Sequence, residues 1–489
     1  MGDQSTEQVV IVGGGISGLS TAYYLLQHAQ KSGCRVHCTV LEAAATFGGK
    51  IKTERVGNSL IEGGPESFVT RKPWAYELCR ELGLADRLLA ADDTGRNYVL
   101  HHGTPEPVPT RPQGFLKTPL LSWPGKLRAA REWWLPARTS TEDESLGNLV
   151  RRRFGDEVLE NLVGPAVGSI YLSDVDHLST LVSFDRFLKL EQTHGSLLKG
   201  MLAMQKAARQ AKKATGKGEA VAAPSTKPPP FVTLPNGLGE WVETLIQRLR
   251  EMGCQLRTQA DVTQIEPRPA GGYQLHLGHA ETVQADVVVL AVPAFAMAHL
   301  IAAHDAASAD QLRAVRYVSV ATVIFAFPRD AVTKPFDGFG VVVPEREGLA
   351  VLACEVMSNK WPARSPQDMV LLRAFLGGHR NEGIVAQPNE VLIPQAQHAL
   401  TGIFGLQGQP IWSRVYRWQP GNPQYPVGHL AALAQTEARL QRTLPHVFLT
   451  GAGMRGLGLP DCVRQARDTA AQVSAALLRI NKPVLEVQS

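Results

Sequence analysis

The chain has 489 residues, of which 44% are hydrophobic and 19% charged, so it can bury several packed cores and is not a disordered protein. Its formal net charge of +5 is mild for this length and fits an acidic small-molecule substrate as well as an anionic membrane surface or nucleic acid. No run approaches the roughly 18 apolar residues that a membrane-spanning helix requires, so we expect no such helix.

The six cysteines are scattered along the chain and form neither a disulfide framework nor a zinc pattern. They predict free thiols in a reducing compartment and no metal site. Because the first apolar run begins at Val9, we expect no signal peptide before it. These features predict a cytoplasmic protein that is soluble or peripherally attached to a membrane.

The apolar, mostly β-branched run from Val9 to Val12 predicts a buried strand, and the glycines after it turn the chain into a helix from Ile16 to about Gln30. Gly13, Gly15 and Gly18 have the G-x-G-x-x-G spacing of a dinucleotide-binding turn. The first glycine permits the tight turn, the second lets the backbone approach a pyrophosphate, and the third lets the helix pack on the strand. The phosphates would lie at the helix N-terminus, where free N–H groups and the helix dipole favour negative charge.

A second strand-like run over residues 35–41 ends just before Glu42. A carboxylate in this place can bind both ribose hydroxyls of an adenine nucleotide and would repel a 2′-phosphate. Glu42 follows Gly18 by 24 residues (42 − 18), which is close to the usual offset of about 20. The alternative is an ordinary strand–turn–helix with a surface glutamate. We predict a site for an adenine dinucleotide.

Two further segments near the start of the chain have the composition of ligand-binding loops. Gly48 and Gly49 precede Lys50, and backbone without side chains beside a cation suits a close approach to phosphate or flavin, although a simple turn is the alternative. A rigid Gly-Pro loop follows the strand that ends near Glu62, and a helix is expected over residues 73–83.

From about Asp92 to Gln205 the chain is expected to be mostly helical, after a short strand over residues 97–101. Trp123, Trp133 and Trp134 lie in this part among basic residues. Such a patch can lie in a membrane interface, and the alternative is a packed helix with a solvated face.

Residues 206–230 are rich in lysine, alanine and proline, which predicts a flexible insertion. Without interleaved aromatic residues, this segment does not indicate a nucleic-acid-binding arm.

The rest of the chain predicts a helix, a series of strands and a closing strand–loop–helix. The helix is expected over 240–252, and strands are expected over 255–258, 262–266, 273–277 and 283–292 and, in a separate mixed or antiparallel sheet, over 318–327, 340–343, 349–355 and 369–376. A strand over 447–450, a glycine-rich loop over 451–460 and a helix from 461 to about 479 end the chain.

The closing loop favours FAD over NAD as the dinucleotide. It again directs a helix N-terminus toward a ligand, and in a flavoprotein that positive end can stabilise the negative charge of a reduced isoalloxazine. An NAD enzyme has no need of such a second site at the far end of the chain.

Motifs along the whole chain are shared with one group of flavoproteins. They are the Gly13–Gly18 turn, Glu42, Gly48-Gly49-Lys50, the loop 62–68, Gly168-Ser169-Ile170-Tyr171, residues 191–197, Trp361-Pro362, Pro423-Gln424-Tyr425 with Gly428-His429, and the closing segment 456–462. In these motifs the chain resembles the flavin-dependent protoporphyrinogen/coproporphyrinogen oxidases, which belong to the amine oxidase and phytoene desaturase superfamily. The opening turn is common to many flavoproteins, whereas the Pro-Gln-Tyr and closing motifs are much more specific.

The resemblance implies non-covalent FAD, because no cysteine lies in a context similar to covalent flavin attachment. The implied FAD contacts are Gly13, Gly14, Gly15, Ile16, Ser17, Gly18, Glu42, Ala43, Lys50, Gly64, Pro65, Glu66, Ser67, Val262, Trp418, Ala452, Leu457, Gly458 and Leu459.

The resemblance also implies a mixed fold with α/β and α+β parts. A discontinuous Rossmann-type FAD-binding domain would use residues 1–90, 231–300 and 430–489. A helical domain that faces the substrate or a membrane would use 91–205, and a substrate-binding mixed sheet would use 301–429.

The implied reaction is the oxygen-dependent removal of six electrons from coproporphyrinogen III, with three hydrides passed to flavin N5 and three O₂ reduced to H₂O₂. No catalytic side chain is expected, because hydride abstraction chiefly needs the flavin, correct placement and a water-poor pocket. Protoporphyrinogen IX is the alternative substrate. An amine oxidase or carotenoid desaturase, and a membrane-docked flavin scaffold without activity, are more distant alternatives.

Three residues are candidates for binding this substrate. Arg71 can bind a propionate with two hydrogen bonds, and a surface arginine is the alternative. Ile170 and Tyr171 can pack against the macrocycle, or they can be core residues. The expected partners are the porphyrinogen and O₂, the next enzyme of the haem pathway and a peripheral membrane surface, but no nucleic acid.

Overall fold

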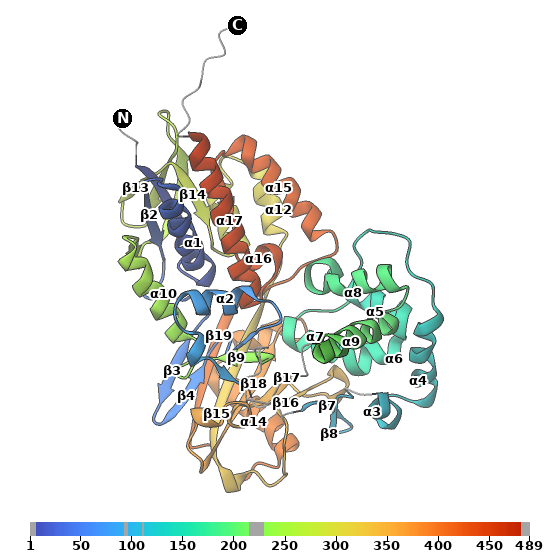
Figure 1. Cartoon of the computed structure of the whole chain (residues 1–489). Coiled ribbons are helices and arrows are strands. Elements are labelled where there is room, and N and C mark those ends of the chain that lie inside the picture. The colour runs from blue at the N-terminus through green and yellow to red at the C-terminus, as the bar shows by residue number, and fades with distance from the viewer. Residues whose placement is uncertain (1–5, 92–95, 110–111, 215–228, 481–489) are drawn as a thin grey trace. The chain divides into compact units, whose positions relative to one another are not determined.

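The computed structural model describes residues 6–91, 96–109, 112–214 and 229–480 of the chain (Figure 1). The fold is a mixture of α/β and antiparallel β parts, as the sequence predicts. The chain forms two compact units, which are Met1–Ala91, Pro230–Arg316 and Leu430–Ser489 (unit 1) and Asp92–Pro229 and Tyr317–His429 (unit 2). Among the described residues, no helix is long and apolar enough to cross a membrane.

A five-stranded parallel sheet forms the centre of unit 1, with the strand order β10-β2-β1-β14-β20. Its two central strands are nearly continuous apolar runs, as expected where both faces of a parallel sheet are covered. The strands are Glu7–Val12 (β1), Val36–Leu41 (β2), Gln255–Arg257 (β10), Val287–Leu290 (β14) and Val447–Leu449 (β20).

Helices from the two ends of the chain pack against each other in unit 1. They are α1 (Ile16–Ser32) and α17 (Leu459–Ile480), which lie side by side in Figure 1. α1 ends where Gly33 adopts the left-handed conformation with φ of 72°, which glycine reaches without strain. The helix predicted over 16–30 is thereby confirmed and runs two residues further.

The remaining strands of unit 1 belong to three small antiparallel sheets. They are the hairpin of β3 (Thr53–Val56) and β4 (Ser59–Glu62), the sheet of β5 (Phe68–Val69), β9 (Phe231–Thr233) and β6 (Leu89–Ala90), and the sheet of β11 (Val262–Pro267), β12 (Tyr273–Leu277) and β13 (Thr282–Ala285). The other α-helices of the unit are α2 (Trp74–Glu81), α10 (Gly239–Glu251), α11 (Ala294–Ile301), α12 (Ala306–Arg313), α15 (His429–Thr443) and α16 (Ala452–Arg455).

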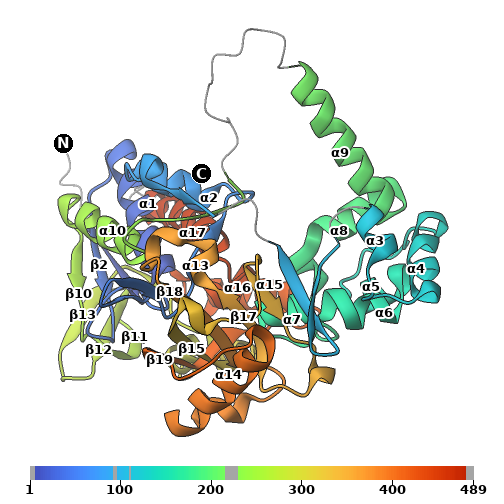
Figure 2. The same ribbon diagram turned by 90° about the horizontal axis from the view of Figure 1, so that it is seen from below.

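Unit 2 contains a seven-stranded sheet in the order β19-β15-β18-β17-β16-β7-β8. The strands are β7 (Asn97–His101), β8 (Thr104–Pro107), β15 (Tyr317–Pro328), β16 (Gly340–Val342), β17 (Val351–Val356), β18 (Met369–Gly377) and β19 (Trp412–Pro423). Helix α14 (Asn389–Phe404) packs on the sheet and completes its apolar core (Figure 2). All neighbours are antiparallel except β7 and β16, so residues 97–107, expected in the helical part, extend this sheet.

The helices of unit 2 lie mainly between β8 and residue 214. They are α3 (Pro112–Lys117), α4 (Trp123–Ala130), α5 (Leu146–Phe154), α6 (Asp156–Val158), α7 (Gly164–Tyr171), α8 (Thr180–His194), α9 (Leu197–Ala214) and, after β17, α13 (Met357–Lys360). The 3₁₀ turn η2 (Arg131–Trp134) follows α4.

Helix α9 differs from the expectation of a flexible insertion over 206–230, because its last turns occupy residues 206–214. This part of the chain is rich in alanine, lysine, arginine and glutamine, which are strong helix formers. Residues 215–228 lie outside the described part of the chain, so the expectation is not tested there.

A buried ion pair organises the helices of unit 2. The guanidinium of Arg153 and the carboxylate of Glu132 are both fully buried and hydrogen-bonded to each other. The same carboxylate accepts hydrogen bonds from the hydroxyl of Ser196 and from the backbone N–H groups of Leu197 and Leu198. Glu132 therefore caps the N-terminus of α9 while it pairs with α5.

Candidate cofactor site

The turn between β1 and α1 leaves no room for side chains at its first and third glycines. Gly13 has φ of 110°, and a β-carbon on it would lie 2.9 Å from the backbone carbonyl of Ala291. A β-carbon on Gly18 would lie 1.9 Å from the carbonyl oxygen of Gly13. The tight turn and the close packing of helix on strand thus account for these two glycines.

The second glycine of the motif has space around it. Gly15 has φ of −75°, and a β-carbon on it would meet only the Cα of Gly49, at 3.8 Å. The protein itself therefore does not require glycine here. The open side leaves room for a ligand to approach this backbone closely, as the second glycine of the motif permits.

Glu42 is fixed at the end of β2, beside the glycine turn. Its Oε2 accepts a hydrogen bond of 2.7 Å from the N–H of Gly14, and its Oε1 accepts one of 2.8 Å from the N–H of Ala44. Because each carboxylate oxygen can accept two hydrogen bonds, Glu42 keeps capacity for the hydroxyls of a ribose.

The Gly48–Lys50 segment lies directly against the same turn. The N–H of Gly48 donates to the carbonyl of Gly14 at 2.9 Å, and a β-carbon on Gly49 would lie 3.2 Å from the Cα of Gly15. Two stretches of bare backbone therefore face each other. Burial lowers the pKa of Lys50, the cation that follows them.

The closing loop reaches the same edge of the parallel sheet. β14 pairs with β1 on one side and with β20 on the other, so Val12 and Leu449 end on the same edge, one strand apart. The backbone then turns at Gly451 and Gly456, with φ of 121° and 120°, before α17 begins. The predicted contacts Ala452 and Leu457–Leu459 thereby lie at the edge that carries the opening turn.

Side chains also link the opening and closing segments. Cys462, in the first turns of α17, lies near Ser17 of α1 and near Lys50. Burial raises the pKa of the Cys462 thiol to about 11, against the opposing effect of a hydrogen bond with Ser17. All six cysteines are free, as the sequence predicts.

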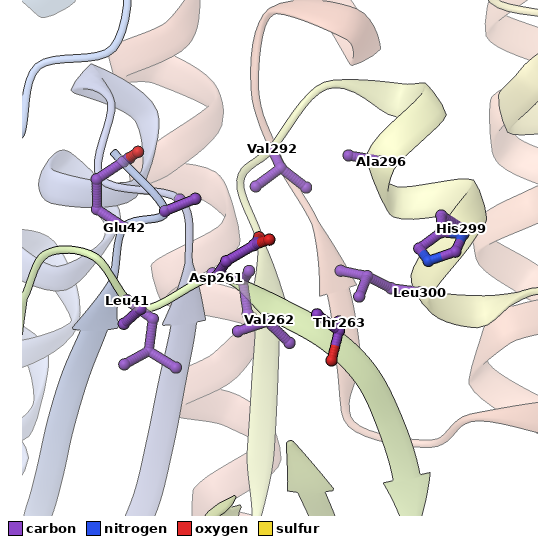
Figure 3. A pocket seen from close by; sticks show the side chains of 13 residues that line it. Leu41, Glu42, Asp261, Val262, Thr263, Val292, Ala296, His299 and Leu300 are labelled. Atoms are coloured by element: carbon purple, nitrogen blue, oxygen red, sulfur yellow. The ribbon is translucent and has the colours of Figure 1, made fainter. Parts of the chain in front are cut away.

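A cavity of about 210 Å³ opens beside Glu42 at the carboxyl edge of the sheet (Figure 3). Figure 3 shows Glu42 on one side of it, Val262 and its neighbours below, and His299 of α11 on the opposite side. The lining residues are Val12, Gly13, Leu41, Glu42, Ala43, Ala260, Asp261, Val262, Thr263, Val292, Ala296, His299 and Leu300. Position, size and a carboxylate beside apolar walls suit the adenosine end of a dinucleotide.

The loop with Gly64, Pro65, Glu66 and Ser67 joins β4 to β5 in the same unit. Past β5, Lys72 forms an ion pair with Asp461 at the start of α17, with its Nζ 2.7 Å from Oδ1 and 2.6 Å from Oδ2. This ion pair connects the segment after β5 to the N-terminus of α17.

Arg71 and Lys72 are adjacent but differ in their surroundings. The side chain of Arg71 is exposed, and it makes no hydrogen bond or ion pair with the described residues. Of these two cations, Arg71 is the one available to an incoming carboxylate.

The other candidates belong to unit 2. Ile170 and Tyr171 form the last residues of α7, and Ile170 is 67% exposed, so it is not a core residue. The ring of Tyr171 lies 5.5 Å from that of Phe184. Trp418 of β19 packs against the apolar cluster around Leu172. These residues belong to unit 2, whereas the glycine turn, Glu42 and the closing loop belong to unit 1.

Several residues that line the cavity are not predicted from the sequence, and they include His299, Asp261 and Thr263. A signal for His299 exists, because the buried run 287–290 reads as a parallel strand and is followed at once by a helix. The carboxyl ends of parallel strands meet at one edge, so α11 could be expected beside the first turn. The ion pair of Lys72 is not predicted either, because no spacing in the sequence relates Lys72 to Asp461.

The model of the family described as "Flavin containing amine oxidoreductase" matches residues 16–474 of the chain. The chain is 35% identical to coproporphyrinogen III oxidase of Bacillus subtilis, over 96% of this chain and 98% of the relative. It is 31% identical to coproporphyrinogen III oxidase of Staphylococcus aureus, over 96% of this chain and 100% of the relative. It is also 31% identical to the chloroplastic protoporphyrinogen oxidase of Oryza sativa, over 98% of this chain and 90% of the relative.

Solved structures agree with this similarity. A protein of Exiguobacterium sp. 255-15 that was assigned as a protoporphyrinogen oxidase superposes with a TM-score of 0.83 and is 29% identical, over 97% of this chain and 100% of that chain. Cyclohexylamine oxidase of Brevibacterium oxydans has a TM-score of 0.66 and is 17% identical, over 97% and 100% of the two chains, which supports a common fold alone.

Proposed function

The chain belongs to the family of flavin-containing amine oxidoreductases, and from this premise we propose that it oxidises coproporphyrinogen III to coproporphyrin III with FAD and dioxygen. The observation that carries this proposal is the full-length similarity to bacterial coproporphyrinogen III oxidases, at 31% to 35% identity. Protoporphyrinogen IX is the alternative substrate, favoured by the similarity to chloroplastic protoporphyrinogen oxidases.

FAD is proposed to be held non-covalently in unit 1. Its pyrophosphate would lie at the N-terminus of α1, where the open side of Gly15 admits a ligand. Its ribose would be bound by Glu42, and its adenine would enter the cavity between Val262 and His299. No cysteine lies in a sequence context similar to covalent flavin attachment, which is the basis for proposing a non-covalent cofactor.

The isoalloxazine is proposed to lie beside Leu457–Leu459, before the N-terminus of α17. When bound, the flavin would take three hydrides from the substrate in succession and pass the electrons to three O₂, which leave as H₂O₂. The helix N-terminus would favour the negative charge of the reduced ring. The remaining proposed contacts, Lys50 and Gly64–Ser67, flank the same edge of the sheet.

The substrate carries propionates, which need cations. Arg71 is the proposed partner for one of them, because it is exposed, lies near the closing loop through its neighbour Lys72, and can form a two-bond contact with a carboxylate. Ile170 and Tyr171 are proposed to pack on the macrocycle, and Trp418 is proposed to contact FAD. The exposure of Ile170 supports a role in binding, since an exposed isoleucine gains from apolar contact.

The proposal is tested by mixing the purified protein with each porphyrinogen in air and recording porphyrin fluorescence and peroxide. We expect three molecules of H₂O₂ for each porphyrin and a larger kcat/KM for coproporphyrinogen III. A rate equal to that of spontaneous oxidation with both substrates would contradict the proposed function. A preference for protoporphyrinogen IX would select the alternative substrate.

A peripheral membrane contact is proposed at a surface of unit 2 formed by α3, α4 and η2. Leu116, Trp123, Leu127 and Trp134 are 57%, 67%, 71% and 76% exposed there. Glu132, the acid of this stretch, is fully buried. Exposed aromatic and apolar side chains suit a lipid surface.

Co-sedimentation with vesicles tests the contact, with binding expected to vesicles of anionic lipid and to weaken in Trp123→Ala/Trp134→Ala. Equal recovery of both proteins in the supernatant would contradict it. The coproporphyrin product would pass to the next enzyme of the haem pathway, which is the proposed protein partner.

A further inference from the structure

The ion pair between Lys72 and Asp461 lies beside the loop 456–459, next to which the isoalloxazine is proposed to bind. Asp461 belongs to the first turn of α17, and its side chain is only 13% exposed. A β-carbon on Gly456 would lie 3.0 Å from the Cβ of Asp461, and one on Gly458 would lie 3.0 Å from its Oδ2. The Asp461 side chain therefore occupies the space that side chains at these two positions of the loop would need.

The loop is rigid around the carboxylate. The side-chain amide of Gln465 donates to the carbonyls of Gly456 and Asp461, and its oxygen accepts a hydrogen bond from the N–H of Arg455. Gln465 is itself 4% exposed. The loop backbone thus has little freedom to move away from a charge placed beneath it.

A partly buried negative charge in this place opposes the electrostatics that favour a reduced flavin. The N-terminus of α17 favours electrons on the flavin ring, whereas an uncompensated carboxylate in the same turn disfavours them. Lys72 supplies the compensation, because its ammonium contacts both oxygens of Asp461. Lys50 and Arg464 act electrostatically on the neighbouring Cys462, whereas Lys72 contacts the carboxylate of Asp461.

From this geometry, and resting on the proposed function, we infer that Lys72 is a positioning residue that raises the reduction potential of the bound flavin by neutralising Asp461. Arg71 binds substrate, whereas its neighbour Lys72 acts on the flavin through Asp461. Two adjacent cations of one loop thereby have separate tasks.

The inference is tested by measuring the midpoint potential of the bound flavin, by equilibration with a reference dye, in Lys72→Met, Asp461→Asn and the double variant. We expect a lower potential in Lys72→Met, an equal or higher potential in Asp461→Asn, and recovery in the double variant. Lys72→Arg keeps the charge and should keep the potential. The anaerobic rate of flavin reduction by substrate should fall about fivefold in Lys72→Met, the effect of one partly exposed ion pair.

The matched control is Lys31→Met, which removes an exposed lysine in the last turn of α1, at the end of that helix away from the glycine turn. If Lys72→Met binds FAD with the potential of Lys31→Met, the inference is wrong. It is also wrong if Lys72→Met cannot fold while Asp461→Asn leaves the potential lower than in the wild type. A wild-type protein that holds FAD but oxidises neither porphyrinogen would contradict the proposed function alone, because the potentials are measured without substrate.

Discussion

Gly15 and Gly18 belong to one motif, but glycine is favoured at the two positions for different physical reasons. The Gly18 backbone is closed in by Gly13, whereas the Gly15 backbone is open on the side where the pyrophosphate is proposed to lie. A side chain at Gly18 would therefore disturb the fold, and a side chain at Gly15 would disturb the ligand.

Alanine at each position separates these two causes. We expect Gly15→Ala to change the free energy of unfolding of the apoprotein by less than about 0.5 kcal/mol and to weaken FAD binding at least tenfold. Gly18→Ala should instead destabilise the apoprotein by about 2 kcal/mol or more. Urea denaturation of the apoproteins and fluorescence titration with FAD measure both quantities. Equal FAD affinity in Gly15→Ala and wild type would remove the argument for a ligand at this turn.

Arg71 is the residue on which the proposed recognition of a propionate depends. Arg71→Ala should raise the KM for coproporphyrinogen III about tenfold and leave the absorption spectrum of the flavin unchanged, because the lost contact is a charged hydrogen-bonded pair. Arg80→Ala, which removes an exposed cation from α2, is the control. An unchanged KM in Arg71→Ala would show that Arg71 is a surface arginine with no role in substrate binding.

At the scale of elements, a buried carboxylate joins α12 to α15. Asp305 caps α12 through the N–H of Ser308, and it accepts hydrogen bonds from Arg439 and Thr443 of α15. Burial alone would raise the pKa of Asp305, but these hydrogen bonds prevail and lower it to about 2. The ionised form of Asp305 is therefore stabilised in the folded protein.

This pKa has a consequence for stability as a function of pH. Because the pKa is depressed on folding, the contribution of Asp305 is complete above about pH 4 and is lost as the pH falls toward 2. Asp305→Asn keeps the cap and should cost about 2 kcal/mol at pH 7 and less than about 0.5 kcal/mol near pH 2, where half of the carboxylate is still ionised. The control Asp310→Asn, at a side chain that is 74% exposed, should cost less than about 0.5 kcal/mol. A cost of Asp305→Asn that is constant with pH would contradict the assigned pKa.

The elements that sequence reasoning predicts well are those whose periodicity is set by burial. β1 and α1 carry continuous or helical apolar patterns because both sides of their sheet are covered, and each differs from expectation by two residues at one end. The strand expected over 283–292 is divided into β13 and β14, which belong to different sheets. β7 and β8 are assigned to the sheet only by pairing with β16, a contact over more than two hundred residues that no local pattern encodes. The last turns of α9 differ from expectation because lysines and a following proline tract predict a flexible segment, whereas residues 206–214 are rich in helix formers.

In the candidate site, too, residues in local sequence patterns are predictable and residues placed by long-range contacts are not. Gly13, Gly18 and Glu42 are predictable because a spacing in the sequence reflects a local turn. His299 and Lys72 are not, because each meets the site through a long-range contact of the folded chain. The roles of all these residues toward FAD stay predictions.

At the scale of the whole molecule, FAD would join the first and last segments of the chain. The opening turn, the cavity residues of β11 and α11, and the closing loop come from the three separate segments of unit 1. A ligand that contacts all three segments should raise the free energy of unfolding of unit 1, because it binds only the folded state.

Removal of the cofactor tests this expectation. The apoprotein should unfold at a temperature lower by about 5 °C or more than the protein with FAD in hundredfold excess over its Kd. FMN, which lacks the adenosine, should restore little of this difference. Full restoration by FMN would contradict the assignment of the cavity beside Glu42 to adenosine.

The central claim is that the flavin of this chain accepts electrons from a porphyrinogen. It is tested most directly by mixing the FAD-loaded protein anaerobically with coproporphyrinogen III and recording the flavin and porphyrin absorbance together. We predict that the flavin is bleached and that three FAD are reduced for each coproporphyrin III formed, with the colour restored when O₂ is admitted. A flavin that stays oxidised while the porphyrinogen is unchanged would contradict the claim.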